Sequence, residues 1–347
     1  MAEPFFSLHR QDQGEALEAV RALTGRPVHL LEKDVWVVWA LSALFDTKLG
    51  KALTFKGGTA LSKAFKVIDR LSEDIDLTYD ISHLIGELAG NSDGLPITRC
   101  QASEWTSAVR QRLPTWIEST IIPILESAMV KDRLSGRLEL VGENRDKLLL
   151  SYPPIGLGTG YVAPAVVLKF GAHLTGEAHQ MVPITCDMNG HLSGILFPSA
   201  HAQVMGVSCT FWEKATTAHL YCLKGSLRGE RYARHWYDLA ALSRSEFFEP
   251  AIRDRDVAVA VARNKSLFSI EKDWNGEDID YARAVDGHLR IVPDGKALTA
   301  LATDYAAMIE DQVMLGDAPG FETLMQTCRQ VEALANHAAY TTTGGMA

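Results

Sequence analysis

The chain is poor in cysteine and has no cysteine pair at metal-binding spacing. Its five cysteines are scattered and odd in number: Cys100, Cys186, Cys209, Cys222 and Cys328. That pattern argues against a disulfide framework and against a structural zinc site. It is typical of a protein kept in a reducing compartment, so we expect a cytoplasmic location.

Long apolar runs are also missing. No run of about 18 or more apolar residues occurs in the sequence, which argues against a membrane-spanning helix. Residues 1–6 place no basic region before an apolar run, so no signal peptide is evident. Apolar residues nevertheless make up 47% of the 347-residue chain, enough for a full core in one large domain or two ordinary ones.

Positive charge is in deficit, since the formal net charge is −9. An acidic protein is a poor general binder of nucleic acid, because contacts to phosphate dominate that affinity. A nucleic-acid substrate would therefore need a local basic patch. One candidate, with only Glu230 opposing it, consists of Lys224, Arg228, Arg231, Arg234 and His235. A solvated helix face explains the same residues equally well.

A glycine turn follows a short apolar segment near the start of the chain. Residues 52–55 indicate a buried strand that stops at Gly57 and Gly58. Paired glycines let a ligand approach the main chain closely. Thr59 suits the N-cap of a helix that continues through Ile68. The start of that helix would offer free N–H groups to an anion.

A pair of carboxylates follows the turn. Residues 73–79 alternate in polarity, so Asp74 and Asp76 share one face of a strand while Ile75 and Leu77 face the core. Adjacent carboxylates repel each other, and a divalent cation removes that conflict. Mg²⁺ commonly joins one or two carboxylates to substrate phosphates. Either motif alone fits a tight turn or a solvated strand end, but together they favour chemistry on a nucleoside triphosphate.

Two motifs carry a resemblance to a known family: Lys56-Gly57-Gly58-Thr59 and Ser72-Glu73-Asp74-Ile75-Asp76-Leu77. Over roughly residues 32–245 the chain resembles the nucleotidyltransferase toxins of the AbiEii/AbiGii group. That group includes the MenT toxins of mycobacteria and belongs to the DNA polymerase β-like nucleotidyltransferase superfamily. The resemblance implies Mg²⁺-dependent transfer of NMP from an NTP to the 3′ end of tRNA. It also implies an AbiEi-like antitoxin partner and a role in growth arrest or phage defence.

The resemblance further assigns residues to the site. The metal ligands and first catalytic residues would be Asp74 and Asp76. The residues expected around the nucleotide phosphates are Lys56, Gly57, Gly58, Thr59, Ser72 and Lys63. Seen by itself, Lys63 fits a solvated helix position equally well, and Ser72 fits a hydrogen bond within the turn.

Two further catalytic residues follow from the resemblance in the helical part of the chain. Lys214 would neutralise triphosphate charge, a role that suits a compact ammonium. Asp238 would orient Lys214 or the incoming group. Taken alone, Arg234 and Asp238 fit an ion pair one helical turn apart. We keep that interpretation for Arg234 and give Asp238 the active-site role.

One expected acid is missing. Polymerase β-like enzymes usually place a third carboxylate on a later strand, which here corresponds to residues 165–171 and contains Lys169. Asp187 ends the next strand and is not an obvious equivalent. Either one metal site does most of the work, or Asp76 doubles as the base. Two alternatives therefore stay open: transfer to a small molecule or protein hydroxyl, and a non-catalytic nucleotide-binding module.

The order of elements predicts an α+β fold with a polymerase β-like core, a mixed sheet and a helical C-terminal domain. We expect a nucleotidyltransferase domain at 1–206, with N-terminal helices, a helical domain at 207–340 and a disordered tail at 341–347. Helices are expected at 13–45, at 99–130 with breaks at Pro114 and Pro123, and at 210–223 and 230–243. Strands are expected at 137–141, 148–152, 165–171 and 182–186. The acidic stretch 276–280 echoes the carboxylate motif, but no glycine turn precedes it, so a capping or loop role is expected.

Overall fold

The structure is a computed structural model that describes residues 2–72, 74–89, 96–158, 162–173, 179–226, 231–310, 313–314 and 316–343. The chain divides into two compact units. The first consists of Met1–Lys66, Leu71–Gly94 and Trp105–Met205. The second consists of Val67–Arg70, Leu95–Glu104 and Gly206–Ala347. Two short segments from the N-terminal part of the chain therefore belong to the second unit.

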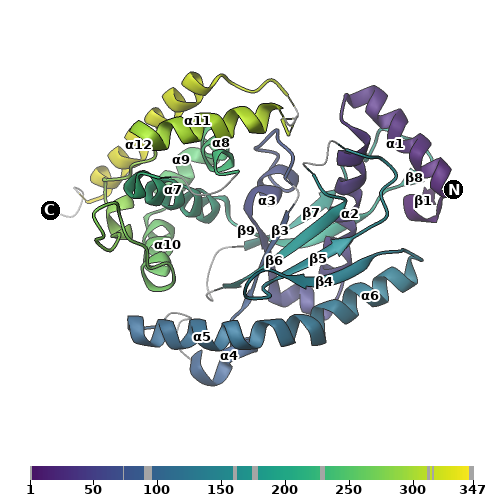
Figure 1. Cartoon of the computed structure of the whole chain (residues 1–347), viewed down its shortest axis with the longest axis horizontal. Coiled ribbons are helices and arrows are strands. Elements are labelled where there is room, and N and C mark those ends of the chain that lie inside the picture. Colours follow the sequence, from purple (N-terminus) through teal and green to yellow (C-terminus); the bar gives the residue numbers. More distant parts are fainter. Residues whose placement is uncertain are drawn as a thin grey trace. The chain divides into compact units, whose positions relative to one another are not determined.

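A seven-stranded mixed sheet forms the centre of the first unit (Figure 1), and its strand order is β4-β5-β6-β3-β2-β9-β7. The strands are β2 (Leu53–Lys56), β3 (Asp74–Asp80), β4 (Arg137–Val141), β5 (Lys147–Ser151), β6 (Ala165–His173), β7 (His179–Thr185) and β9 (Ser199–Met205). A separate two-stranded ladder joins β1 (Glu3–Pro4) to β8 (Ile195–Leu196). The predicted α+β class with a mixed sheet is confirmed.

Strand β3 shows why the carboxylates reach one side of this sheet. Its alternate residues Ile75, Leu77 and Tyr79 are buried, whereas Asp74 and Asp76 are only partly covered. Successive strand residues point to opposite faces, so the apolar set fills the core while both acids stay on the other face. Neighbouring strand β2 pairs antiparallel with β3, and β6 pairs parallel with it.

The predicted N-terminal helix is two helices, α1 (Arg10–Thr24) and α2 (Val28–Phe45). Gly25 ends α1 in the left-handed conformation with φ of +73°, and Pro27 immediately precedes α2. Helix α2 is buried on nearly all sides and packs against β9, β6 and α6. That position explains why residues 35–41 of this helix are all apolar, since a helix surrounded by core has no solvent face.

The remaining helical elements of the N-terminal part follow the prediction less closely. They are η1 (Phe5–Ser7), η2 (Lys48–Ala52), α3 (Gly57–Lys63), α4 (Ser82–Ala89), α5 (Arg99–Trp116), a π-helical turn (Ile117–Ile121) and α6 (Ile122–Lys131). Pro114 and Pro123 flank the π-helical turn rather than ending the helix. Proline removes a backbone donor, and a widened turn accommodates that loss without a break.

The second unit is predominantly helical. Its helices are α7 (Val207–Lys224), α8 (Ala233–Leu242), α9 (Phe248–Arg253), α10 (Arg255–Phe268), η4 (Tyr281–Ala284), α11 (Gly295–Glu310) and α12 (Phe321–Thr343). Phe211, Trp212 and Trp236 are fully buried in its core. The predicted disorder of residues 341–343 is wrong because α12 continues through Thr343, and 344–347 lie outside the described residues. Within the described ranges, no helix is both long and apolar enough to cross a bilayer.

Candidate active site

The glycine turn and the carboxylate strand meet at one point. Gly57 adopts a left-handed conformation with φ of +81°, and a Cβ placed on it would lie 2.3 Å from Asp76 Oδ2. Any side chain at this position would therefore collide with the carboxylate as well as strain the backbone. The absence of a side chain brings the main chain of the turn directly against Asp76, so the two predicted motifs form one site.

Thr59 does not cap a helix as predicted. Helix α3 already begins at Gly57, and Thr59 lies fully buried within its first turn. Its hydroxyl forms a hydrogen bond with the Ser72 hydroxyl at 2.9 Å and donates to the backbone carbonyl of Asp74. Thr59 and Ser72 thus hold the start of β3 against α3, which fixes where Asp74 begins. Glu73, between them in the motif, lies outside the described residues.

Helix α3 is also shorter than predicted. It ends at Lys63 rather than Ile68, and Lys66 takes a left-handed conformation with φ of +54° that ends any helical path. The helix has seven residues, so its dipole is small, and the close approach at Gly57 remains the main feature of the turn.

Lys63 does not point to a phosphate site. Its side chain is 5% exposed and forms ion pairs with Asp34 and, at 2.7 Å, with Asp187. Burial opposes the charge of Lys63, but the carboxylates of Asp34 and Asp187 outweigh it and raise the lysine pKa. Asp187 also pairs with Arg26. These contacts give Lys63 a structural role, and they occupy Asp187, so neither residue joins the predicted site.

A row of charged side chains crosses the sheet at the level of Asp76. In consecutive strands β2, β3, β6 and β5, the residues in register are Lys56, Asp76, Lys169 and Lys147. Residues directly opposite each other on neighbouring strands place their side chains on the same face. Lys169 additionally forms an ion pair with Asp74. The strand expected to supply a third carboxylate therefore supplies an ammonium instead.

In the second unit, Asp238 is fully buried between two cations. Lys214 Nζ lies 2.8 Å from Asp238 Oδ2, and Arg70 binds both carboxylate oxygens at 2.7 Å. Burial alone would raise the pKa of Asp238, but Arg70 and Lys214 hold it well below its usual range. Asp238 therefore contacts Lys214 directly, and its orienting role stays a prediction. Asp238 pairs with these residues instead of Arg234, which lies one helical turn away.

Arg70 is a partner of Asp238 that the sequence analysis did not predict. It is 3% exposed, and its bidentate contact with Asp238 joins positions 168 residues apart. Planar guanidinium groups match carboxylates in this paired geometry better than ammonium groups do. Arg70 lies between the two motifs, four residues before Asp74, and its local sequence gives no sign of a partner so far along the chain.

The predicted basic face of the second unit is not supported. Lys224 is paired with Glu271 at 2.7 Å. Burial, with the nearby Lys214 charge, lowers the pKa of His235 to about 3, so this imidazole is neutral at pH 7. Arg228 lies outside the described residues. The positive charge predicted for this segment is therefore reduced, by an ion pair at Lys224 and by the neutral imidazole of His235.

Among the described residues, Asp74 and Asp76 are the candidate ligands for a divalent cation. Within the described ranges, no group of three or more histidine, cysteine or acidic side chains could hold a metal ion. Mg²⁺ is often held by one or two carboxylates, with substrate phosphates and water completing its shell. Asp74 and Asp76, beside the glycine turn, fit that mode.

Comparison with family models decides the assignment. Residues 39–327 match the model described as nucleotidyl transferase AbiEii toxin, type IV toxin–antitoxin system. The chain belongs to the AbiEii toxin family. It is thus a nucleotidyltransferase of a type IV toxin–antitoxin system, and membership implies an NTP substrate and an antitoxin partner.

Two further comparisons accompany the family match. No curated protein matched the sequence. Among solved structures, the chain is similar to the nucleotidyltransferase toxin MenT4 of Mycobacterium tuberculosis, at 16% identity and a TM-score of 0.42. That similarity covers 96% of this chain and 99% of the MenT4 chain.

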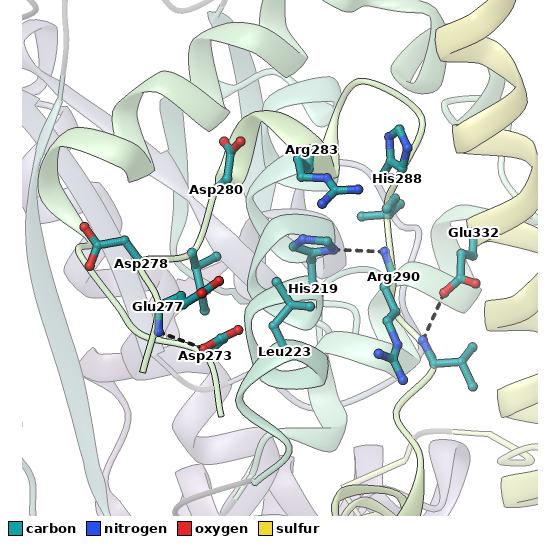
Figure 2. Close-up of a pocket in the computed structure, with 13 residues that line it drawn as sticks. His219, Leu223, Asp273, Glu277, Asp278, Asp280, Arg283, His288, Arg290 and Glu332 are labelled. Atoms are coloured by element: carbon teal, nitrogen blue, oxygen red, sulfur yellow. Dashed lines mark hydrogen bonds between the residues drawn. The ribbon is translucent and has the colours of Figure 1, made fainter. Parts of the chain in front are cut away.

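The second unit of this toxin also contains a polar cavity of about 680 Å³ (Figure 2). Its acidic side chains mostly bind backbone N–H groups of the surrounding loop. Asp273 accepts from Glu277, and Glu332 accepts from Ile291 at 2.7 Å. Asp280 caps η4 by accepting from Ala282. The capping or loop role expected for residues 276–280 is confirmed.

Substituting Gly57 with alanine should inactivate the toxin. The new methyl group must displace Asp76, and a misplacement of this kind can cost about 100-fold in rate. Gly25→Ala is the matched control, because Gly25 has φ of +73° but nothing within 4 Å of a Cβ. Both variants should lose about 1–2 kcal/mol of stability from backbone strain. Nucleotidyl transfer and thermal melting separate the effects, and equal activity loss in both would contradict this assignment.

Removing Asp238 should destabilise the chain strongly. Asp238→Ala leaves Arg70 and Lys214 buried without their shared carboxylate, and loss of one partner from such a cluster costs about 3–5 kcal/mol. Glu249→Ala, which breaks an exposed pair with Arg253, should change stability by less than about 0.5 kcal/mol. Urea denaturation followed by circular dichroism measures both, and similar midpoints for the two variants would be contrary to expectation.

The stability of the toxin should fall on mild acidification because of His219. This residue is 3% exposed, and burial with the charges of Arg290 and Arg283 lowers its pKa to about 4. Its ordinary pKa is about 6.5, so below that pH the unfolded chain takes up the proton that the folded one excludes. The contribution of neutral His219 to the free energy of unfolding is therefore complete above pH 6.5 and is lost as the pH falls towards 4.

The loss should reach about 2 kcal/mol at pH 5. His219→Asn keeps an acceptor for the N–H of Arg290, which now binds Nδ1 at 3.0 Å, and removes the titration. Urea midpoints at pH 7.5 and pH 5 should therefore differ less in the variant than in the unmodified protein. Identical differences would show that His219 does not contribute.

Proposed function

We propose that this toxin uses Mg²⁺ to transfer NMP from an NTP to the 3′ end of tRNA. The observation that carries the proposal is the contact between the Gly57 turn and Asp76, which supports a single site for a phosphate and a cation. Growth arrest or phage defence would follow from loss of usable tRNA. An AbiEi-like antitoxin is the partner we propose for its control.

The proposed reaction is an in-line displacement at the α-phosphorus. A hydroxyl oxygen of the acceptor forms a bond to phosphorus, the bond to the bridging β-phosphate oxygen breaks, and pyrophosphate leaves. Bound Mg²⁺ would neutralise the developing charge on the phosphoryl and leaving oxygens. Asp74 and Asp76 are the residues that would hold it.

We assign the proton of the attacking hydroxyl to Asp76. The Asp74 carboxylate is already engaged in an ion pair with Lys169. The Asp76 carboxylate lies against the glycine turn, next to where we place the phosphates. Positioning and electrostatics would then supply most of the rate enhancement, because phosphoryl transfer requires little covalent chemistry from the protein.

The backbone of Gly57 and Gly58, with Lys56 beside them, would bind the β- and γ-phosphates. Thr59 and Ser72 would keep this turn in register with β3, as their hydrogen bond suggests. Lys214 would offset triphosphate charge, and Asp238 and Arg70 would hold its ammonium in position. Because Asp238 binds two cations, one of them can turn to an anion without leaving the carboxylate unpaired.

A transfer assay tests the proposal. The protein is incubated with Mg²⁺, total RNA and each NTP labelled at the α-phosphate, beside Asp74→Ala and Asp76→Asn variants. We expect labelled product of tRNA size only with the unmodified protein. Label on a protein or small molecule would instead support transfer to another hydroxyl. Bound NTP with no transfer would support a non-catalytic nucleotide-binding module, which the lysine at position 169 would fit.

Removal of divalent cations should abolish the same transfer. Without a divalent cation, Asp74 and Asp76 would repel a triphosphate, so EDTA is expected to reduce product to background and added Mg²⁺ to restore it. Circular dichroism before and after chelation checks that the fold survives. Undiminished transfer in EDTA would contradict the proposed role of the two acids.

A further inference from the structure

We propose that Lys169 and Lys147 bind a phosphodiester group of the acceptor, next to its attacking hydroxyl. The acceptor is then a nucleic-acid end, which carries such a group, rather than a protein or a small alcohol. This inference rests on the proposed function, because it starts from the placement of the triphosphate over the glycine turn.

The order of strands gives the direction of attack. The glycine turn follows β2, on one side of the carboxylate strand β3, and β6 and β5 lie on the other side. In-line displacement places the attacking and leaving oxygens on opposite sides of the phosphorus. If the β- and γ-phosphates lie over Gly57 and Gly58, the acceptor approaches from the side of β6 and β5.

The two lysines lie in this approach path. Lys169 is in register with Asp76, and Lys147 is in register with Lys169 on the next strand. Both side chains are half-buried on the face that carries Asp74 and Asp76, and the side chain of Lys169 is 39% exposed. Their ammonium groups can therefore reach an anion at this face without a rearrangement of the sheet.

The pairing of two lysines is itself unfavourable. Like charges directly opposite each other on neighbouring strands destabilise a sheet. Asp74 offsets the charge of Lys169, but among the described residues no ion pair offsets that of Lys147. A phosphate shared by both ammonium groups would remove the repulsion. Because the net charge is −9, a nucleic-acid substrate would need local positive charge, which this pair of lysines supplies.

The first experiment measures RNA binding without NTP or divalent cations. A fluorescent single-stranded RNA with a free 3′ hydroxyl is titrated with full-length protein over a range of salt concentrations. Lys147→Met and Lys169→Met should each weaken binding about threefold to tenfold and reduce the salt slope by about 0.7. Lys147→Arg and Lys169→Arg keep the charge and should retain most of the affinity.

Two further variants serve as controls. Lys51→Met removes an exposed lysine just before β2, at the end of that strand away from Lys56, and should leave RNA binding unchanged. Lys56→Met should weaken binding of a fluorescent NTP analogue but not of RNA. Thermal melting of every variant confirms that the sheet is intact. Equal RNA binding by all lysine variants would overturn the inference.

The second experiment measures turnover with the RNA acceptor. Lys147→Met should raise the KM for RNA severalfold while the KM for NTP and kcat change little. If unmodified protein transfers no nucleotide to RNA, the proposed function itself fails. If it does transfer, and Lys169→Met lowers only kcat while Lys147→Met has no effect, Lys169 is merely the counter-ion of Asp74 and the inference is wrong.

Discussion

The approach of a glycine main chain to a carboxylate is the constraint on which the site depends. At Gly57 the positive φ and the position of Asp76 Oδ2 together exclude every side chain. Hydrogen bonds from Thr59 reinforce the same junction by fixing the backbone at Asp74. A strand, a turn and a short helix thus meet at the place where we propose that a phosphate and a cation bind.

Two clusters of buried charged side chains each place an ion between partners of opposite sign. Lys63 lies between Asp34 and Asp187 in the first unit, and Asp238 lies between Arg70 and Lys214 in the second. A desolvated ion is tolerated only with close partners, so each group constrains the elements that supply its members. The difference between them is chemical. We propose no ligand for the first group, whereas the second contains Lys214, which we propose to face the nucleotide.

Local patterns predicted much of the structure, and contacts distant in sequence account for what they missed. A short apolar segment predicted β2, alternation of polarity predicted β3 with its correct faces, and two glycines predicted the turn. The end of α3 depends on the left-handed conformation of Lys66, which no helical period reveals. Strand β9 was not predicted because its buried residues include Ala200 and Ala202, and alanine is depleted in strands. Pairings such as Arg70 with Asp238 leave no trace in local spacing.

The path of the chain between α3 and β3 has a practical consequence for dissecting this toxin. The short segment Val67–Arg70 belongs to the second unit although it sits within the motif of the first. A fragment beginning at Gly206 would carry Asp238 and Lys214 but lack the guanidinium that binds both oxygens of Asp238. Separate expression of the two halves would therefore create an incomplete ionic core in one of them. Gene fusions, split reporters and truncation series for this protein should keep the glycine motif and the C-terminal helices on one polypeptide.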